Sequence, residues 1–475
     1  MMRIKLFYQR AVFVLLAMCL FGTSYSQTID EKIQDLLDQA EHLTLNNRVD
    51  DAIAIYDRII AIDPKRPLAF YRKGELYISK GRFIDAIKSL ESGVKIENPK
   101  GSQEVDKSKI SEDYLSALEL LGNLYSQLYK AKNAVYFYES AYNLDENVEN
   151  KLRYQLEILS ILFAVNRHTF AMPHVELAKK LQPNNFDVKF FEGQYYNEMG
   201  EFEKSFPLLE SVVSEVEPQD GNEKYYFELG KAYFNLGKYK KAKEAFKNAD
   251  GGRYSFLLKE YEPEYFYYIA QALFEVFEFD ESEKYLKISL QLDPAAAKAH
   301  ELNQKLAGIK QPKGKLIDAK KAAAESAEKE GKTTLLIDSY KDLAALYYQN
   351  GDYEFAIDAV QNWEALDKNI NLYRILLKAM AGYKMGDPNE SFIMLNKSVK
   401  NPRMPGGDKA RFNVARGMIY LSQKKYKEAS SAFKAAYKGS YKAVSRAKLN
   451  EIEQIKARSS SATLDDAKEG DEGGK

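Results

Sequence analysis

The sequence predicts an all-α protein, an α-solenoid in which about eleven antiparallel helix pairs follow one another along the chain. Three observations predict this fold. One pattern of small and aromatic residues recurs at steps of about 34–40 residues, which is the range of helical repeat proteins. Apolar residues within each copy recur at helical spacing, and glycine, asparagine or proline separates the helical stretches.

The chain begins with the features of an exported protein. Basic residues open it, an apolar run covers residues 11–21, and small residues suit cleavage before Gln27. We therefore interpret residues 1–26 as a signal peptide and expect a periplasmic protein whose mature chain has no transmembrane segment. The residues up to Cys19 loosely resemble a bacterial lipobox, so lipidation of Cys19, and with it association with the outer membrane, is the alternative.

The clearest copy of the recurring pattern centres on Gly230. Bulky residues around Gly230 mark one face of a first helix, Gly237 begins a turn, and Ala242 and Phe246 share one face of a second helix. Small residues let the two helices approach closely, while the aromatic rings fill the space beside them. A proline such as Pro64 often closes the unit, because proline cannot continue the preceding helix.

The same small position of the first helix can be followed through the chain. It falls at Ala40, Gly74, Gly122, Leu159, Gly193, Gly230, Ala270, Ala344, Ala379 and Gly417. A double step between Ala270 and Ala344 predicts a degenerate unit with helices at 295–306 and 315–330. A polar insertion at 97–109 is interpreted as a surface loop.

The degenerate unit is the expected break in the array. We predict an N-terminal array over 27–308, a hinge over 309–314 and a C-terminal array over 315–458; one continuous superhelix is the alternative. A helix at 443–457 is expected to cap the last unit, because stacked arrays need a terminal cap. Residues 459–475 are rich in Ser, Asp, Glu and Gly, so we predict a disordered acidic tail.

The residues around Gly74, Gly230 and Gly417 resemble the tetratricopeptide repeat (TPR) family, in an exported bacterial type. The resemblance covers roughly residues 30–440 and implies a right-handed superhelix. It also implies that the first helix of each unit lines a concave ligand-binding surface. On the expected exposed face of that helix, an aromatic residue is followed by an amide or charged group and often by another large residue. The candidate partner-binding groove consists of Tyr71, Glu75, Phe190, Gln194, Asn197, Phe227, Lys231, Phe234, Tyr267, Gln271 and Phe274.

Aromatic rings on a concave face suit an extended peptide or an amphipathic helix as the ligand. The alternative is that these rings pack against the first helix of the neighbouring unit, as aromatic stripes at helical spacing usually do. Some members of the family hold a C-terminal carboxylate with lysine and asparagine at these positions. Aromatic residues take the place of the lysine here, so that mode of binding is not expected.

The sequence carries no recognisable catalytic motif. Gly331 lies in a Gly-Lys-Thr segment that lacks the first glycine of a phosphate-binding loop, and we interpret it as a helix-ending turn. His168 and His174 do not have the spacing of zinc ligands. With one cysteine and four histidines, cysteine-based metal sites and disulfide frameworks are excluded. We expect no catalytic residue, no cofactor and no metal.

These observations predict a non-enzymatic scaffold for protein–protein interaction in the bacterial cell envelope. Its expected partners are proteins or peptides of an envelope complex. Lys+Arg and Asp+Glu are equal at 69 each, so there is no basic field to attract nucleic acid, and no small-molecule substrate is expected. The alternative is an envelope protein that binds carbohydrate or peptidoglycan, because aromatic stripes also stack on sugar rings.

Overall fold

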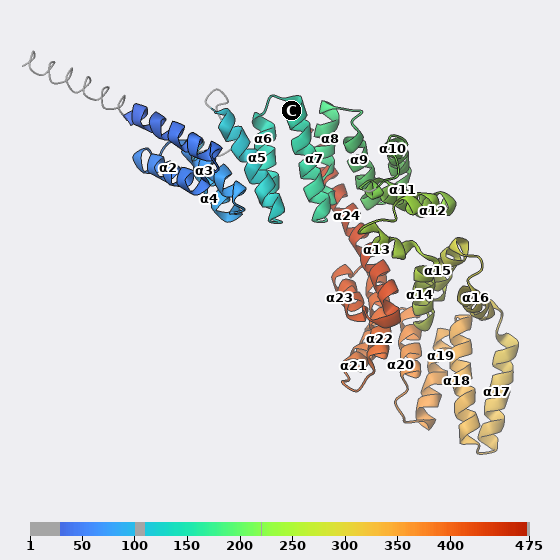
Figure 1. Ribbon diagram of the computed structural model, residues 1–475. Helices are drawn as coiled ribbons and strands as arrows, with labels where there is room; N and C mark the ends of the chain where they lie inside the picture. The colour runs from blue at the N-terminus through green and yellow to red at the C-terminus, as the bar shows by residue number, and fades with distance from the viewer. Residues whose placement is uncertain (1–28, 100–109, 220, 473–475) are drawn as a thin grey trace, which may run out of the picture. The chain divides into compact units, whose positions relative to one another are not determined.

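The computed structural model describes residues 29–99, 110–219 and 221–472. The predicted signal peptide, Cys19 and most of the insertion at 97–109 lie outside these residues. The described part of the chain is helical and contains no strand, which confirms the predicted all-α fold of successive helix pairs (Figure 1). None of its helices combines the length and the apolar character needed to cross a bilayer.

The chain forms two compact units, one up to Glu192 and the other from Gly193 onward. The first unit contains a helix over residues 29–45, α2 (Val49–Ile62), α3 (Pro67–Ser79), α4 (Phe83–Glu97), α5 (Glu112–Gln127), α6 (Ala131–Leu144), α7 (Val148–Ala164), η3 (His168–Phe170) and α8 (Met172–Leu181). Helix α9 (Phe186–Met199) crosses the boundary between the units. The second unit then contains α10 (Phe202–Ser214), α11 (Glu223–Asn235), α12 (Tyr239–Asn248), α13 (Tyr254–Leu258), η4 (Lys259–Tyr261), α14 (Pro263–Glu275), α15 (Phe279–Leu292), α16 (Ala297–Lys310), α17 (Gly314–Lys329), α18 (Thr333–Asn350), α19 (Tyr353–Leu366), α20 (Leu372–Lys384), α21 (Pro388–Val399), α22 (Gly406–Ser422), α23 (Tyr426–Ala436), η5 (Gly439–Tyr441) and α24 (Lys442–Glu472).

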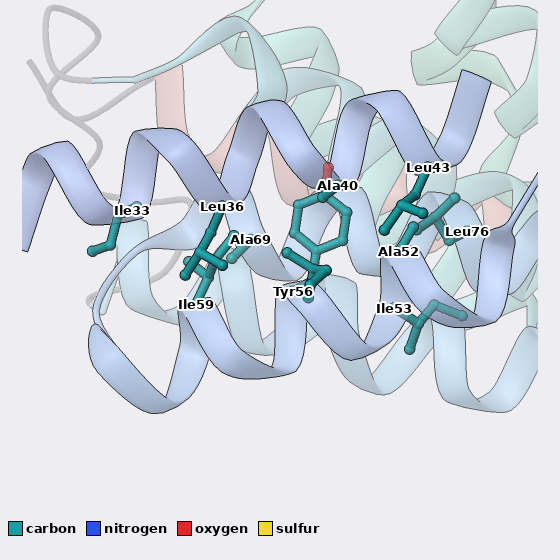
Figure 2. Close-up of a cluster of buried hydrophobic side chains, with 11 residues drawn as sticks. Ile33, Leu36, Ala40, Leu43, Ala52, Ile53, Tyr56, Ile59, Ala69 and Leu76 are labelled. Carbon is teal, nitrogen blue, oxygen red and sulfur yellow. The ribbon is translucent and has the colours of Figure 1, made fainter. Parts of the chain in front are cut away.

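The first helix pair shows how each unit builds its core. The helix over residues 29–45 places Leu36 and Ala40 against Tyr56 and Ile59 of α2, and Figure 2 shows these side chains in one buried layer. The turn between the helices contains Asn47 with a φ of 59°, a left-handed conformation that asparagine adopts more readily than most residues. The cluster continues into α3, so each pair also packs on the next one.

Within a pair, the small residue of the first helix faces a large residue of the second. A Cβ atom added to Gly230 would lie 2.4 Å from the Phe246 ring, and one added to Gly417 would lie 2.6 Å from the Phe433 ring. The two helices can therefore approach closely only because these positions lack a side chain. This contact is the physical origin of the recurring sequence pattern.

Three units replace the second-helix alanine of the pattern with serine. The Ser391 hydroxyl donates to the carbonyl of Ala379, with 2.6 Å between the oxygens. The hydroxyls of Ser205 and Ser282 donate in the same way, at 2.8 Å and 2.7 Å, to the small position of their own first helix. Because each buried hydroxyl finds an acceptor, the replacement leaves no unsatisfied donor in the core.

The degenerate unit forms its two helices close to the predicted positions, but within the described chain they do not pack as a pair. Helix α16 packs on α15 and α18, whereas α17 packs along α18. The apolar residues of α16 join the core of α14 and α15, so α17 is left to pair with the following helix.

The predicted hinge at 309–314 lies inside the second compact unit, which begins at Gly193. Contacts cross the predicted hinge. The Phe277 ring lies 5.1 Å from the Tyr348 ring, and Lys384 pairs with Glu278 at 2.8 Å. These contacts join residues on the two sides of residues 309–314.

The last helix, α24, packs on α23 as the expected cap does, but it also packs on α14. The Tyr265 hydroxyl of α14 donates to the carbonyl of Ala443, with an O–O distance of 3.3 Å. The Lys448 ammonium is 1% exposed and lies 2.6 Å from the carboxylate of Glu281 on α15. The C-terminal helix therefore returns to a much earlier part of the second unit.

Helix α24 continues to Glu472, whereas the sequence predicts a disordered tail from residue 459. The segment lacks proline and contains alanine, lysine and glutamate, which favour helix. The backbone of α24 can therefore continue past its packed first half without a break.

Candidate partner-binding surfaces

In the first unit, the predicted groove residues divide into buried and accessible members. Tyr71 is 1% exposed, and its hydroxyl donates to the Glu97 carboxylate at 2.9 Å. Its ring packs against Gly93 of the second helix of the same pair. Phe190 is also buried, whereas Glu75 is half-buried and pairs with Arg72 at 3.0 Å.

In the second unit, aromatic residues of the predicted groove are covered by other rings. Phe227 lies 5.2 Å from the Tyr254 ring and 5.9 Å from the Tyr261 ring. Phe234 is stacked on Phe266 at 5.2 Å. The inserted helices α13 and η4 supply Tyr254 and Tyr261, so this insertion buries the stripe that was expected to face a ligand.

The remaining groove residues of α14 are half-buried. Tyr267 and Phe274 pack against the apolar cluster that α14 and α15 share with α16. Gln271 donates to the Glu275 carboxylate at 3.3 Å. Part of each side chain stays accessible.

The expected exposure is therefore absent at five positions: Tyr71, Phe190, Asn197, Phe227 and Phe234 are all buried. The physical reason is that these side chains fill the spaces between neighbouring helices, as the packing alternative anticipates. The predicted residues that retain accessible surface are Glu75, Gln194, Lys231, Tyr267, Gln271 and Phe274.

Three of the predicted residues belong to a buried polar cluster between α9 and α11. The Lys231 ammonium lies 2.5 Å from the Glu198 carboxylate and 3.7 Å from that of Glu228. The Asn197 side-chain amide donates to Glu228 at 2.8 Å, and the Gln194 amide donates to it at 3.3 Å. A buried charge held by partners on both sides fixes the two first helices against each other.

Burial raises the pKa of the Glu228 carboxyl, and Lys231 opposes this shift. Burial alone would lower the pKa of Lys231, but Glu228 and Glu198 raise it by more, so its pKa lies above the ordinary lysine value. Lysine therefore keeps its positive charge at neutral pH. The cluster contributes to the packing of α9 against α11.

An open cleft of about 520 Å³ lies in the second unit between α13, α14 and the start of α24. Its wall includes Phe256, Tyr268 and Tyr437, which are 61%, 38% and 41% exposed. Among the residues that line it, the Arg446 guanidinium pairs with the Glu260 carboxylate. Sequence reasoning missed this cleft because its two walls come from segments almost 180 residues apart.

A second cleft of about 440 Å³ lies beside α12. Phe234 and Tyr261 line it, together with Lys243 and Lys247 of α12. Phe234 thus touches a cavity although little of its ring is accessible.

Three further residues, His168, His174 and Gly331, take part in packing, a side-chain contact and a turn. His168 is buried, and the His174 Nδ1 atom lies 2.8 Å from the Gln155 side-chain oxygen. No cluster of three or more metal-ligating side chains occurs within the described ranges. Gly331 has a φ of 66° and ends α17, which confirms the predicted helix-ending turn.

The helix pairs and their glycine-to-aromatic contacts define a helical repeat protein of the α-solenoid class. Residues 37–102, 223–251 and 410–438 match family models described as tetratricopeptide repeat. These three segments are therefore similar to tetratricopeptide repeats. A comparison with curated proteins finds no match.

The chain is similar to several solved repeat structures. One is YrrB, described as a TPR protein with an unusual peptide-binding site, at 18% identity over 45% of this chain and 90% of that chain, with a TM-score of 0.30. Another is MamA, at 20% identity over 42% and 97%, with a TM-score of 0.31. A third is the TPR domain of P58(IPK), at 12% identity over 90% and 99%, with a TM-score of 0.23. The repeat assignment rests on the three matched segments and on the helix packing.

Proposed function

We propose that this chain is a non-enzymatic scaffold that binds partner proteins or peptides in the bacterial cell envelope. The observation that carries the proposal is the presence of tetratricopeptide repeats in a chain of successive helix pairs. The recurring residues of these repeats pack the helices together, so the other surface positions are free to contact a partner. The signal-like start of the sequence, and the absence of cysteine after residue 19, support an exported protein.

Site-specific photocrosslinking in living cells tests the scaffold. Photoreactive residues are placed singly at Glu75 of α3 and Gln271 of α14, which are half-buried on first helices. A matched probe replaces Ile393, which is 68% exposed on the second helix α21. We expect the first-helix probes to trap a defined protein, identified by mass spectrometry, and the probe at 393 to trap none. Equal adducts from all three positions, or none from any, would contradict the proposal.

A carbohydrate-binding function is the second candidate, and the exposed rings of Phe256, Tyr268 and Tyr437 favour it. Flat aromatic faces of this kind stack on sugar rings as well as on peptides. Adding soluble peptidoglycan fragments or polysaccharide to the cell extract separates the two functions. Protection of a probe at 256 by polysaccharide, with no protein adduct from any position, would favour the carbohydrate function.

Export is tested by sequencing the N-terminus of the protein recovered from fractionated cells. Cleavage as proposed gives a mature chain that begins at Gln27. A chain that begins at an acylated Cys19 would show a lipid anchor instead. An intact Met1 in the cytoplasmic fraction would refute the envelope setting.

A further inference from the structure

We propose that the cleft between α13, α14 and α24 binds an acidic peptide segment of a partner protein, with an aromatic or large aliphatic residue as its anchor. This inference rests on the proposed scaffold function and gives the scaffold a site and a type of partner. It uses none of the residues of the predicted groove. The cleft has the volume of an ordinary ligand site, about 520 Å³.

Exposed aromatic rings gather at this cleft, although many large apolar side chains of the described chain are buried. Phe256 of α13, Tyr268 of α14 and Tyr437, which follows α23, all line this one cleft and are all exposed. Grouped exposed aromatic residues mark interaction sites more often than scattered ones do. Each ring can cover a large apolar area of a ligand while losing little conformational freedom.

The charges that line the cleft favour an acidic ligand. Lys259 and Lys442 line the cleft and are exposed, and within the described chain neither has a carboxylate partner. The lining carboxylate, Glu260, is neutralised by Arg446. Two cations therefore remain available at the cleft, which favours an acidic ligand over a basic or neutral one.

Contacts within the chain hold the walls of the cleft in place. The Tyr265 hydroxyl donates to the Ala443 carbonyl, the Tyr441 hydroxyl donates to Glu275, and Arg446 pairs with Glu260. These contacts tie α14 and η4 to η5 and to the start of α24. A ligand would enter a formed site without first having to order it, and this preorganisation favours binding.

The acidic C-terminus of the same chain is a poor occupant. Helix α24 begins at Lys442, beside the cleft, and its acidic end starts near Asp465. With a rise of 1.5 Å per residue, the helix carries that end roughly 35 Å away. An acidic segment of another protein is therefore the occupant that the cleft fits.

The test uses the full mature chain and a labelled synthetic peptide of alternating aspartate and phenylalanine, with binding followed by fluorescence anisotropy. Two matched peptides replace either aspartate by lysine or phenylalanine by alanine. We expect only the first peptide to bind well, and its affinity to fall as salt rises. Equal binding of all three peptides, or binding of none, would overturn the proposal.

The protein variants are the double change K259E and K442E, and the single change F256S. All three side chains are exposed, so the fold should be retained, as the emission of Trp363 in the same unit can verify. We expect each variant to weaken binding of the acidic peptide at least tenfold. The control K427E, at an exposed lysine in the first turn of α23 that does not line the cleft, should bind as the unchanged protein does. Equal affinity in cleft and control variants would overturn the proposal.

Two further results identify other occupants. If deletion of residues 458–475 strengthens peptide binding tenfold, the chain's own tail fills the cleft. This result would overturn the proposal. If the protein self-associates and F256S abolishes this self-association, a second copy of the chain fills the cleft, and the proposal would again be overturned. In cells, a photoreactive residue at 256 should trap a protein, and K259E with K442E should abolish that adduct. Adducts from 75 or 271 without one from 256 would leave the scaffold standing and reject this site.

Discussion

Replacing Lys448 by methionine should destabilise the second unit by about 2–3 kcal/mol. The ammonium is 1% exposed, lies 2.6 Å from Glu281 and 2.9 Å from Glu451, and sits 5.6 Å from the centre of the Tyr285 ring. Breaking a buried ion pair costs about 3–5 kcal/mol, because the remaining charge keeps no partner. Glu281 is 30% exposed, so water reduces the expected cost. Methionine keeps most of the apolar stem and isolates the loss of charge.

The matched control is Lys310, which pairs with Glu283 of the same helix α15 at the same 2.6 Å separation. Its side chain is 48% exposed, so K310M should cost about 0.5 kcal/mol or less. Both variants are measured by urea unfolding. The only tryptophan of the chain, Trp363, is buried in α19, so its emission reports on the second unit alone.

The contribution of the Lys448 ion pair to stability should also depend on pH. Burial lowers the pKa of Lys448, but Tyr285, Glu281 and Glu451 raise it by more, so its net shift is upward. A raised pKa means that the ion pair contributes fully below about pH 10, the range of an unfolded lysine, and is lost only as the pH rises further. Equal losses in K448M and K310M, or a loss below about 0.5 kcal/mol in K448M, would refute the argument from burial.

Three further predictions concern packing and protonation. G417V should lower the free energy of unfolding by about 2–3 kcal/mol, because the new side chain overlaps the Phe433 ring. The control G407A lies in open space on the same helix and should be neutral or slightly stabilising. Tryptophan emission measures both variants. S391A should cost about 1 kcal/mol in the same assay, because a buried hydrogen bond is lost; no change would contradict this. Burial lowers the pKa of His174, so the folded first unit favours the neutral imidazole. The contribution of His174 to the stability of this unit should therefore be fully present above about pH 6.5. It should fall on acidification by at most about 1.4 kcal/mol per pH unit. Amide exchange in α8 measures this slope, and H174Q should abolish it.

The helix pairs could be predicted from the sequence because their defining contacts are local. Gly230 meets Phe246, and Gly417 meets Phe433, at the same separation along the chain. A contact between residues so close in sequence imposes a fixed spacing on the residue types, and that spacing is visible without a structure. The turn at Gly331 could be predicted for a similar reason, because a left-handed residue is needed where one helix ends.

The accessible surface could not be predicted in the same way. Phe227 and Phe234 lie on one helical stripe, but a stripe does not show what covers it. The covering rings, Tyr254 and Tyr261, come from an insertion that breaks the repeat pattern. The cleft depends on contacts between α14 and α24, and no period in the sequence links residues so far apart.

The return of α24 to α14 has a consequence for the order in which the protein can assemble. The ribosome makes α14 well before it makes α24, so the face of α14 around Tyr265 emerges before the helix that packs on it. Most solenoid repeats complete their contacts as soon as the next repeat has been made. The second unit must instead wait until the first turns of α24 have been made, and a product truncated before α24 would expose the face of α14 on which α24 packs.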